Sequence, residues 1–453
     1  MTDSGDGRAE LGDLDPPDVR RIKIERTELT YQSPISTAHG PIENREVVVL
    51  TLTDGEGRIG LGEAAPLANF TPELVDKAEL AIHRWADDGT LPVDSPTARA
   101  AIDGALLDLT ARAVGRPVHG LLAPGSSGIV PVSAFVSGDT PDDLASAAAE
   151  AVAGGHGTVK VKVAASPFPT DLARLTAVRE ASGDKRLRID ANGGWAPGEA
   201  SEHLARLAAL DLELVEEPAA GLEALATVRA TSPVPVAIDE SARTIDDVRR
   251  AIALGSADLV VLKPSALGGP LVTAEVARVV TEAGLGLVVT SLLEGSVGIR
   301  SAAHLAAALG ALDPAPGLAT ATLLTADSGP PLLPTKGALV LDCPVSPRHP
   351  GWHPAWRLHP PPHRERPRTH EPPPRTRPWT LGTARRPDGA SRRRPEPAEP
   401  LRGSARRPPP SRPGGRRGAG PQRRPTQAPD PPPTQSTRPR PPPRRPAQPR
   451  KPA

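Results

Sequence analysis

The apolar positions of this chain follow two different rhythms, and the first runs through residues 20–125. Strand-like stretches come first, and the Asp54-Gly55 pair between two of them is typical of a hairpin turn. Helical spacing follows, and it opens on Thr71-Pro72, a good N-cap followed by a first-turn proline. This part predicts a small α+β domain. The predicted strands are 22–31, 46–53 and 57–63, and the predicted helices are 71–87 and 96–114.

The second rhythm begins near residue 130, where short apolar runs recur about every 25 residues with Ala- and Leu-rich helical stretches between them. Strands that alternate with helices indicate βαβ units and a parallel sheet. Eight such units in about 195 residues favour a (β/α) barrel over an open doubly wound sheet, and no G-x-G-x-x-G follows the first run. The runs are 131–136, 159–163, 187–191, 212–217, 234–239, 259–263, 285–290 and, more weakly, 317–322.

Composition separates this body from the last part of the chain. Residues 347–453 hold 26 Lys and Arg, 6 Asp and Glu, and 32 of the 58 prolines, whereas residues 1–346 hold 28 basic and 47 acidic side chains. The formal net charge of +1 is therefore the average of an acidic body near −19 and a basic tail near +20. Apolar periodicity ends after Leu341, which predicts disorder. The predicted parts are a disordered leader (1–19), an α+β capping domain (20–125), a barrel with a C-terminal return segment (126–342) and a disordered tail (343–453).

Several classes of protein are excluded by what the chain lacks. A single cysteine, Cys343, rules out a disulfide framework and a cysteine-rich zinc site. No apolar run reaches the roughly 18 residues of a membrane-spanning helix. The stretch Met1–Arg20 is acidic and has no apolar core, so it does not resemble a signal peptide. We therefore expect a cytoplasmic protein without membrane contacts.

Five successive predicted strands of the barrel end in a charged residue. One such residue alone would usually be a helix cap or a solvated loop residue. Five in series indicate a site, because the carboxyl ends of barrel strands meet at one mouth, where active sites lie. The series is Lys162, Asp190, Glu216 or Glu217, Asp239 and Lys263.

The residue types indicate metal-assisted proton abstraction. Three carboxylates without a nearby Cys or His form an all-oxygen site that suits Mg²⁺. A lysine near a divalent ion and another lysine has a lowered pKa and can act as a base next to a substrate carboxylate. Lys160 lies two residues before Lys162 and so faces the same side of the strand. Alternation sends one residue of Glu216-Glu217 and one of Asp239-Glu240 inward, and we expect the other to support its neighbour.

Five motifs resemble the muconate-lactonizing subgroup of the enolase superfamily over about residues 20–342. The resemblance implies a (β/α)7β modified TIM barrel with an N-terminal α+β capping domain. It implies Mg²⁺ as cofactor with Asp190, Glu216 and Asp239 as its ligands, Lys162 as acid and base, Lys263 on the opposite face, and Lys160 as the residue that tunes Lys162. The motifs are Val159-Lys-Val-Lys162, Ile189-Asp-Ala-Asn-Gly-Gly-Trp195, Val215-Glu-Glu-Pro218, Ala237-Ile-Asp-Glu-Ser241 and Leu262-Lys-Pro-Ser265.

Within this subgroup, the chain is most similar to the o-succinylbenzoate synthase family, hydro-lyases of menaquinone biosynthesis. This implies a small-molecule carboxylate as substrate, held under cap loops 36–40 and 66–70, with Gly268-Gly269 and Ser291 as weaker candidates for binding its second carboxylate. N-acylamino acid racemases share the site and are the alternative. Dipeptide epimerases usually carry Asp-x-Asp on the last strand, which 317–322 lacks. The residues behind this assignment are Gly60-Leu-Gly-Glu-Ala-Ala-Pro66, Asp190 to Trp195 and Thr290-Ser-Leu-Leu-Glu-Gly-Ser-Val-Gly298.

The basic tail raises a different class of hypothesis, because a net charge near +20 could bind nucleic acid. The tail has no basic residues interleaved with aromatic ones after Trp379 and no folded RNA-binding motif, so we do not expect nucleic acid as a partner. Its Arg, Pro, Gly and Ala content is what a high-GC gene yields when read in a shifted frame, and that origin is our expectation. A passive extension and a partner-binding tail are the alternatives. The sequence predicts no oligomeric state.

Overall fold

The computed structural model describes residues 17–37 and 40–341. Most of the predicted leader, the whole predicted tail and the tip of the 36–40 loop lie outside these residues, so the expectations for them stay predictions. No helix within the described ranges is long and apolar enough to cross a membrane.

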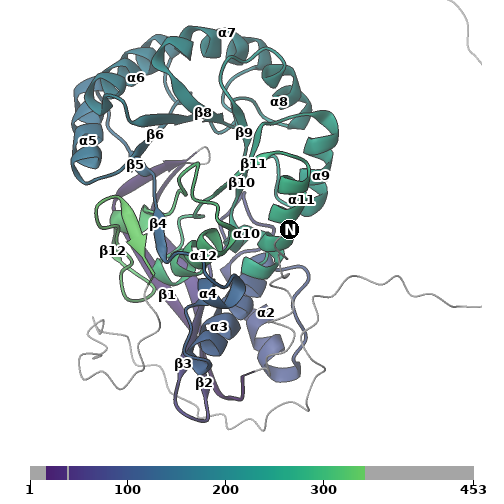
Figure 1. Ribbon diagram of the computed structural model, residues 1–453. Helices are drawn as coiled ribbons and strands as arrows, with labels where there is room; N and C mark the ends of the chain where they lie inside the picture. The colour runs from purple at the N-terminus through teal and green to yellow at the C-terminus, as the bar shows by residue number, and fades with distance from the viewer. Residues whose placement is uncertain (1–16, 38–39, 342–453) are drawn as a thin grey trace, which may run out of the picture. The chain divides into compact units, whose positions relative to one another are not determined.

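The N-terminal part forms an antiparallel sheet with two helices packed against it (Figure 1). The Asp54-Gly55 hairpin is confirmed, because β2 pairs with β3. The first helix begins at Val75 rather than Thr71, since the Thr71 hydroxyl closes a local turn with the N–H and carbonyl of Leu67. The sheet has the order β12-β1-β2-β3. Its strands are β1 (Val19–Thr37), β2 (Gly40–Asp54), β3 (Ile59–Ala64) and β12 (Leu324–Ala326), and its helices are α2 (Val75–Asp88) and α3 (Pro96–Ala113).

Two glycines of β3 allow this sheet to press against α3. A Cβ atom at Gly60 would overlap the carbonyl oxygen of Ala105, and one at Gly62 would overlap that of Ala101. The absence of side chains at these positions lets the helix backbone lie directly on the strand. The next residue of the strand, Glu63, is buried.

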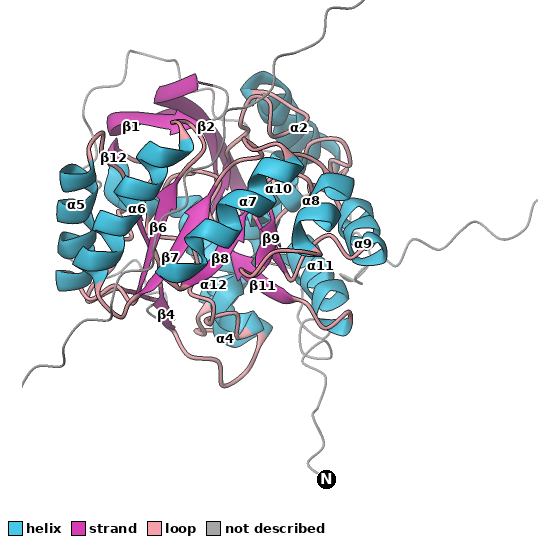
Figure 2. Cartoon of the chain, turned by 90° about the horizontal axis from the view of Figure 1, so that it is seen from above, coloured by secondary structure: helices cyan, strands magenta, loops and turns pink. Residues whose placement is uncertain are grey.

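The rest of the described chain forms a curled parallel sheet of seven strands with helices on its outside, which confirms the predicted barrel class (Figures 1 and 2). Its strands are β5 (Ala134–Val136), β6 (Thr158–Lys162), β7 (Arg186–Asp190), β8 (Leu212–Glu216), β9 (Val236–Ile238), β10 (Leu259–Leu262) and β11 (Gly286–Val289), in sequential order. The connecting helices are α5 (Pro141–Ala153), α6 (Phe168–Ser182), α7 (Pro197–Leu207), α8 (Leu222–Arg229), α9 (Ile245–Leu254), α10 (Pro264–Leu267) and α11 (Pro270–Glu282), and α12 (Ser296–Leu309) follows β11.

The predicted strands at the two ends of the barrel differ from expectation. The 131–136 run splits into β5 and β4 (Ile129–Pro131), and β4 pairs with β13 (Ala338–Val340) outside the barrel sheet. The 317–322 run forms a single bridge from Gly317 to Thr290 and then the 3₁₀ turn Thr320–Leu323. Pro316 faces the opposite neighbour, where its carbonyl accepts from the N–H of Ser133, and it has no N–H to donate on that side.

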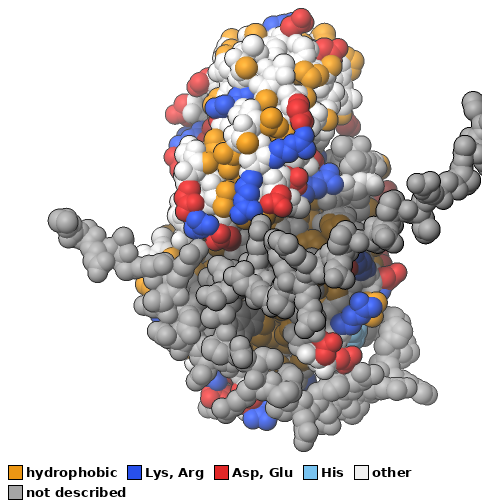
Figure 3. Space-filling model, turned by 90° about the vertical axis from the view of Figure 1, so that its right-hand side faces the viewer, with side chains coloured by type: hydrophobic (Ala, Val, Ile, Leu, Met, Phe, Trp, Pro, Cys, Tyr) orange, Lys and Arg blue, Asp and Glu red, His pale blue; other side chains and the backbone are white. Residues whose placement is uncertain are grey.

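Aliphatic side chains fill the space between the barrel sheet and its helices, as expected for a chain with 2% aromatic residues. Helices α5 and α9 begin at capping boxes, in which Thr140 pairs with Asp143 and Thr244 pairs with Asp247. On the face shown in Figure 3, acidic and basic side chains of the described residues are interspersed. A smaller apolar cluster inside the barrel joins four strands through Leu214, Ala237, Val261 and Val288.

Candidate active site

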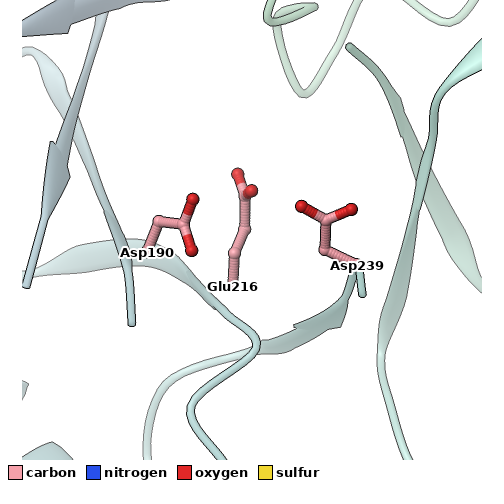
Figure 4. Close-up of side chains that lie close together, drawn as sticks. All are labelled: Asp190, Glu216 and Asp239. Carbon is pink, nitrogen blue, oxygen red and sulfur yellow. The ribbon is translucent and has the colours of Figure 1, made fainter. Parts of the chain in front are cut away.

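Three predicted carboxylates meet at the carboxyl end of the barrel sheet. Asp190, Glu216 and Asp239 stand at the ends of β7, β8 and β9, and Figure 4 shows their carboxylates turned toward one shared space. One oxygen from each lies within 4.8 Å of the others, and all three side chains are buried. Lys162 at the end of β6 and Lys263 after β10 flank this group, because β6 and β10 are the outer neighbours of β7 and β9. The structure therefore brings together the six residues that the sequence predicted as metal ligands and catalytic lysines, namely Lys160, Lys162, Asp190, Glu216, Asp239 and Lys263.

The ambiguity between the two neighbouring glutamates is resolved by the backbone. Glu216 continues the inward alternation of β8, whereas Glu217 adopts a left-handed conformation with φ of 39°. The turned Glu217 side chain accepts hydrogen bonds from the N–H of Asp239, at 2.8 Å, and from the Ser241 hydroxyl. Burial raises the pKa of Glu217 to about 7. Glu217 thus supports Asp239 from behind, as expected for the outward member of the pair.

In the second ambiguous pair, Asp239 belongs to the carboxylate cluster, and Glu240 accepts a hydrogen bond from Asn192 next to it. The Asn192 side-chain amide donates to Glu240 at 2.7 Å, and the Asn192 N–H donates to Asp190 at 3.1 Å. Asn192 also has a left-handed backbone, with φ of 44°. Strained backbone at successive strand ends is a feature that clusters at functional sites. These contacts fix the orientation of the carboxylates that line the mouth.

Lys160 lies among the carboxylates and is ion-paired with two of them. Its ammonium nitrogen is 3.0 Å from Asp190 and also contacts Glu216. Burial alone would lower the pKa of Lys160, but the negative charges of Asp190, Glu216 and Asp239 outweigh it and raise the pKa above its ordinary value. Lys160 is therefore charged and compensates part of the carboxylate charge.

The pKa values of Lys162 and Lys263 are shifted in opposite directions. Burial, with the nearby charges of Lys160 and Lys263, lowers the pKa of Lys162 below its ordinary value, against the attraction of Asp190 and Glu240. Burial also disfavours charge on Lys263, but the attraction of Asp239 and Glu240 prevails and raises its pKa. The Lys263 ammonium contacts both carboxylate oxygens of Asp239. Lys162, on one face of the site, thus loses its proton more readily than Lys263, whose ammonium is ion-paired with Asp239 on the opposite face.

A cap loop reaches the mouth beside Lys263. The Lys263 ammonium lies 4.3 Å from the centre of the Phe70 ring, and the Arg243 guanidinium lies 5.0 Å from it. Arg243 also donates to the carbonyls of Asn69 and Phe70, at 3.1 and 3.2 Å. A small pocket is lined by Phe70, Arg243, Lys263 and Asp239. The sequence indicated the 66–70 loop but not Arg243, which bonds to backbone carbonyls and so leaves no side-chain signature.

The weaker candidates for a carboxylate subsite are engaged elsewhere. The N–H groups of Gly268 and Gly269 both donate to the carbonyl of Pro264. The Ser291 N–H donates to Gly317, and the Ser291 hydroxyl contacts Thr320 at 2.8 Å. The expectation that these amides bind a substrate carboxylate is therefore wrong for the arrangement seen in the structure.

The carboxylate cluster fits a hard divalent cation. All its donors are oxygens, they are close enough to share one ion, and no Cys or His belongs to the cluster. Burial and the charges of Asp190 and Asp239 raise the pKa of Glu216 against the attraction of Lys160, so a cation bound beside Glu216 would favour its ionised form. Asp190, Glu216 and Asp239 are the residues that would hold Mg²⁺.

Comparison with known proteins agrees with this geometry. The profile of the family described as "Enolase C-terminal domain-like" matches residues 143–352. An L-Ala-D/L-Glu epimerase of Bacillus subtilis is 30% identical over 311 residues, which covers 64% of this chain and 85% of that protein. The chain belongs to the enolase superfamily.

Two further superfamily members bear on cofactor and reaction. A dipeptide epimerase from Enterococcus faecalis, solved in complex with Mg and the dipeptide L-Leu-L-Tyr, superimposes with a TM-score of 0.66 at 26% identity and covers 72% of this chain and 97% of that one. An o-succinylbenzoate synthase of Thermobifida fusca is 43% identical over 214 residues, covering 46% of this chain and 66% of that protein. The superfamily relatives thus include epimerases and a synthase, and membership alone does not select between their reactions.

Proposed function

We propose that this chain is an o-succinylbenzoate synthase. It would remove water from 2-succinyl-6-hydroxy-2,4-cyclohexadiene-1-carboxylate and release 2-succinylbenzoate in menaquinone biosynthesis. The observation that carries the proposal is that the Lys263 ammonium is held against both carboxylate oxygens of Asp239, whereas burial and the neighbouring lysines lower the pKa of Lys162. Elimination needs one lysine, which takes the proton and returns it to the leaving oxygen, whereas inversion by two lysines also needs the opposite ammonium to donate a proton to the substrate carbon, and Lys263 donates to Asp239 instead. The 43% identity to a synthase over 214 residues supports the same choice.

Lys162 would carry both proton transfers. Its neutral amine takes the proton from the carbon that bears the substrate carboxylate, and the C–H electron pair moves into the carboxylate to give an enediolate. The pair then returns to form the ring double bond as the C–O bond breaks, and the leaving oxygen takes the proton back from the Lys162 ammonium as water. The ring is then aromatic and Lys162 is again neutral, so one residue completes the cycle.

The remaining charged residues would act by electrostatics. The Lys263 ammonium, held against Asp239, faces the site from the side opposite Lys162 and stabilises the negative charge that develops in the transition state. Lys160 supplies positive charge among Asp190 and Glu216 and lowers the pKa of Lys162. Mg²⁺ bound by the three carboxylates would supply positive charge beside the substrate carboxylate.

N-acylamino acid racemization is the second candidate, because lysines do flank the carboxylates from both sides. Dipeptide epimerization is less well supported. A dipeptide has a free ammonium group, which calls for an acidic partner, and residues 317–322 offer only Gly, Leu, Ala and Thr.

Parallel assays separate these reactions. Protein with Mg²⁺ is mixed with the cyclohexadiene carboxylate, and aromatisation is followed by ultraviolet absorbance, while N-succinyl amino acids and L-Ala-L-Glu are followed by polarimetry. We expect rapid aromatisation and much slower racemization. A kcat/KM for N-succinyl amino acids above that for the cyclohexadiene would replace the synthase by the racemase, and no aromatisation at all would refute the proposal.

A further inference from the structure

One loop of the barrel mouth is held by all three long strands of the cap sheet. This loop, residues 290–295, joins β11 to α12 and follows the carboxyl end of its strand, so it belongs to the mouth. The chemistry proposed above uses none of its residues. Its sequence and the Gly60-Leu-Gly-Glu63 stretch of β3 were both singled out by the resemblance, and the structure shows that the two are in direct contact.

Glu63 is the centre of this contact. One of its oxygens accepts from the N–H of Gly295 at 2.7 Å, and the other accepts from the N–H of Gly298 at 2.9 Å and from the Ser328 hydroxyl at 2.7 Å. Burial raises the pKa of the Glu63 carboxyl group, while the N–H groups of Gly295 and Gly298 at the start of α12 favour its charged form. Glu63 therefore fixes the junction between the loop and α12 from the cap.

Two further cap residues bond the loop upstream of that junction. The Tyr31 hydroxyl of β1 donates to the carbonyl of Leu293 at 2.7 Å. The buried Arg45 guanidinium of β2 donates to the carbonyl of Leu292 and to that of Ala65, which follows β3. The loop is thus bonded at successive backbone groups by side chains from β1, β2 and β3.

The loop itself is shaped for this contact. Leu293 has a left-handed backbone with φ of 59°, a conformation that costs a leucine energy and persists only where the surroundings impose it. A Cβ atom at Gly298 would lie 2.6 Å from Cγ of Glu294 and 3.4 Å from the Glu63 carboxylate. Glycine at this position is what leaves room for the buried Glu294 side chain, and the Glu63 carboxylate lies just beyond it at contact distance.

We propose that Glu63 is a positioning residue, which holds the 290–295 loop in the conformation that completes the substrate side of the mouth. It acts through the backbone of Gly295 and Gly298 and has no part in the proton transfers. Its loss should therefore weaken substrate fit while leaving the carboxylate cluster intact. The choice of substrate in the test rests on the proposed function, but the contact and its effect on the loop do not.

The test uses the full chain with Glu63→Gln, which keeps the size of the side chain and replaces one acceptor oxygen by an amide donor. We expect amide hydrogen exchange to accelerate at least about tenfold in residues 292–298 and to stay unchanged in β7 and β8. The KM for the cyclohexadiene carboxylate should rise on the order of tenfold, with kcat within about threefold of wild type. Calorimetric Mg²⁺ affinity should be unchanged. Glu28→Gln, on the exposed part of β1, is the matched control.

Each outcome decides the proposal. Faster amide exchange with an unchanged KM would overturn the proposal and make Glu63 a purely structural residue. Unchanged amide exchange in residues 292–298 would also overturn it, because Glu63 would then not hold the loop. If Glu63→Gln does not fold, Tyr31→Phe removes only the donor to Leu293, and an unchanged KM in that variant refutes the positioning role. If the cyclohexadiene is not turned over by wild type, the proposed function fails on its own. The KM comparison is then made with N-succinyl amino acids, and the exchange result stands.

Discussion

The described part of the barrel contains two charged clusters built around buried residues, and only one of them has the character of an active site. The mouth cluster consists of Asp190, Glu216 and Asp239 with their lysines. The floor cluster lies at the other end of the strands, where Arg188, only two residues before Asp190, is 1% exposed and ion-paired with Glu213. Burial and charge are therefore shared by both clusters and do not by themselves identify a site.

The two clusters differ in the charged residue types that they contain and in the groups that neutralise their charge. At the floor, one carboxylate of β8 meets two arginines of β7, and the Arg188 guanidinium also donates to the carbonyl of Ala315 at 2.7 Å, while Arg186 reaches Asp313. The Glu213 carboxylate at the floor is thus paired by the chain itself, although Nη2 of Arg188 has no hydrogen-bond partner among the described residues. At the mouth, three carboxylates from three strands face one space, which leaves a demand for a cation. Convergence at the carboxyl ends of several strands, rather than burial, marks the catalytic cluster.

The first prediction concerns the mouth cluster and has the largest expected effect. Asp190→Asn removes one negative oxygen but keeps an acceptor for the Asn192 N–H, so the barrel should fold normally. Activity should fall by about 10³-fold or more, because charge stabilisation by a metal contributes several kcal/mol to the transition state. Isothermal calorimetry should show loss of Mg²⁺ binding, and a chelator should inactivate wild type. Asp184→Asn, whose side chain is 92% exposed, is the control. Unchanged Mg²⁺ affinity in Asp190→Asn would contradict the assignment.

The second prediction concerns the floor cluster. Arg188→Met leaves Glu213 with Arg186 as its remaining cation and should lower the free energy of unfolding by about 3 kcal/mol, as expected when one partner of a buried ion pair is removed. Urea denaturation measures the change, and the folded variant should retain its activity. The double variant Arg188→Met/Glu213→Leu should recover part of the loss. Arg249→Met, from an exposed ion pair, should change stability by less than about 0.5 kcal/mol. A stable but inactive Arg188→Met would contradict the assignment of a purely structural role to the floor cluster.

The third prediction uses a buried pair outside both clusters. His304 of α12 is stacked 5.5 Å from His119 of α4 (Val118–Leu122), and burial, reinforced by His119 and the arginines 300 and 112, lowers the pKa of His304 to about 3. Because the folded pKa lies below the ordinary value of about 6.5, the unfolded chain gains a proton first as the pH falls, and stability is lost between these two values.

At pH 5, this linkage should cost about 2 kcal/mol relative to pH 7. His304→Gln should have a flatter dependence of urea midpoint on pH over this range, whereas His83→Gln, at an exposed position of α2, should keep the wild-type dependence. An identical pH dependence in wild type and His304→Gln would show that the buried imidazole does not resist protonation.

The charged residues at the ends of the barrel strands could be predicted from the sequence. Each follows an apolar run and recurs with the period of one βα unit, so topology alone places Lys162, Asp190, Asp239 and Lys263 at one mouth. Alternation could not assign Glu216 and Glu217, because the left-handed turn at Glu217 breaks the period of two. It also could not place Glu213, which sits at a register shift between β7 and β8 that departs from regular alternation.

The contacts between cap and barrel could not be predicted from apolar periodicity, although the resemblance singled out the segments that contain Glu63 and the 290–295 loop. Glu63, Arg45 and Arg243 bond mainly to backbone N–H and carbonyl groups, which nearly every residue type presents, and the two backbone partners of Glu63 lie 232 and 235 residues away. A pattern of side-chain types cannot reveal such partners. The last predicted strand was wrong in extent because the chain leaves the extended conformation soon after the bridge at Gly317 and forms the 3₁₀ turn Thr320–Leu323.

The central claim is that Lys162 at the mouth removes the proton from the substrate. The most direct measurement is kcat for aromatisation of the cyclohexadiene carboxylate by Lys162→Ala, beside Lys23→Ala, an exposed lysine on β1, as matched control. The account predicts that kcat of Lys162→Ala falls by about 10³-fold or more, with Mg²⁺ affinity and urea midpoint close to wild type, and that Lys23→Ala is fully active. A Lys162→Ala protein that binds Mg²⁺ and still turns over at the wild-type rate would contradict it.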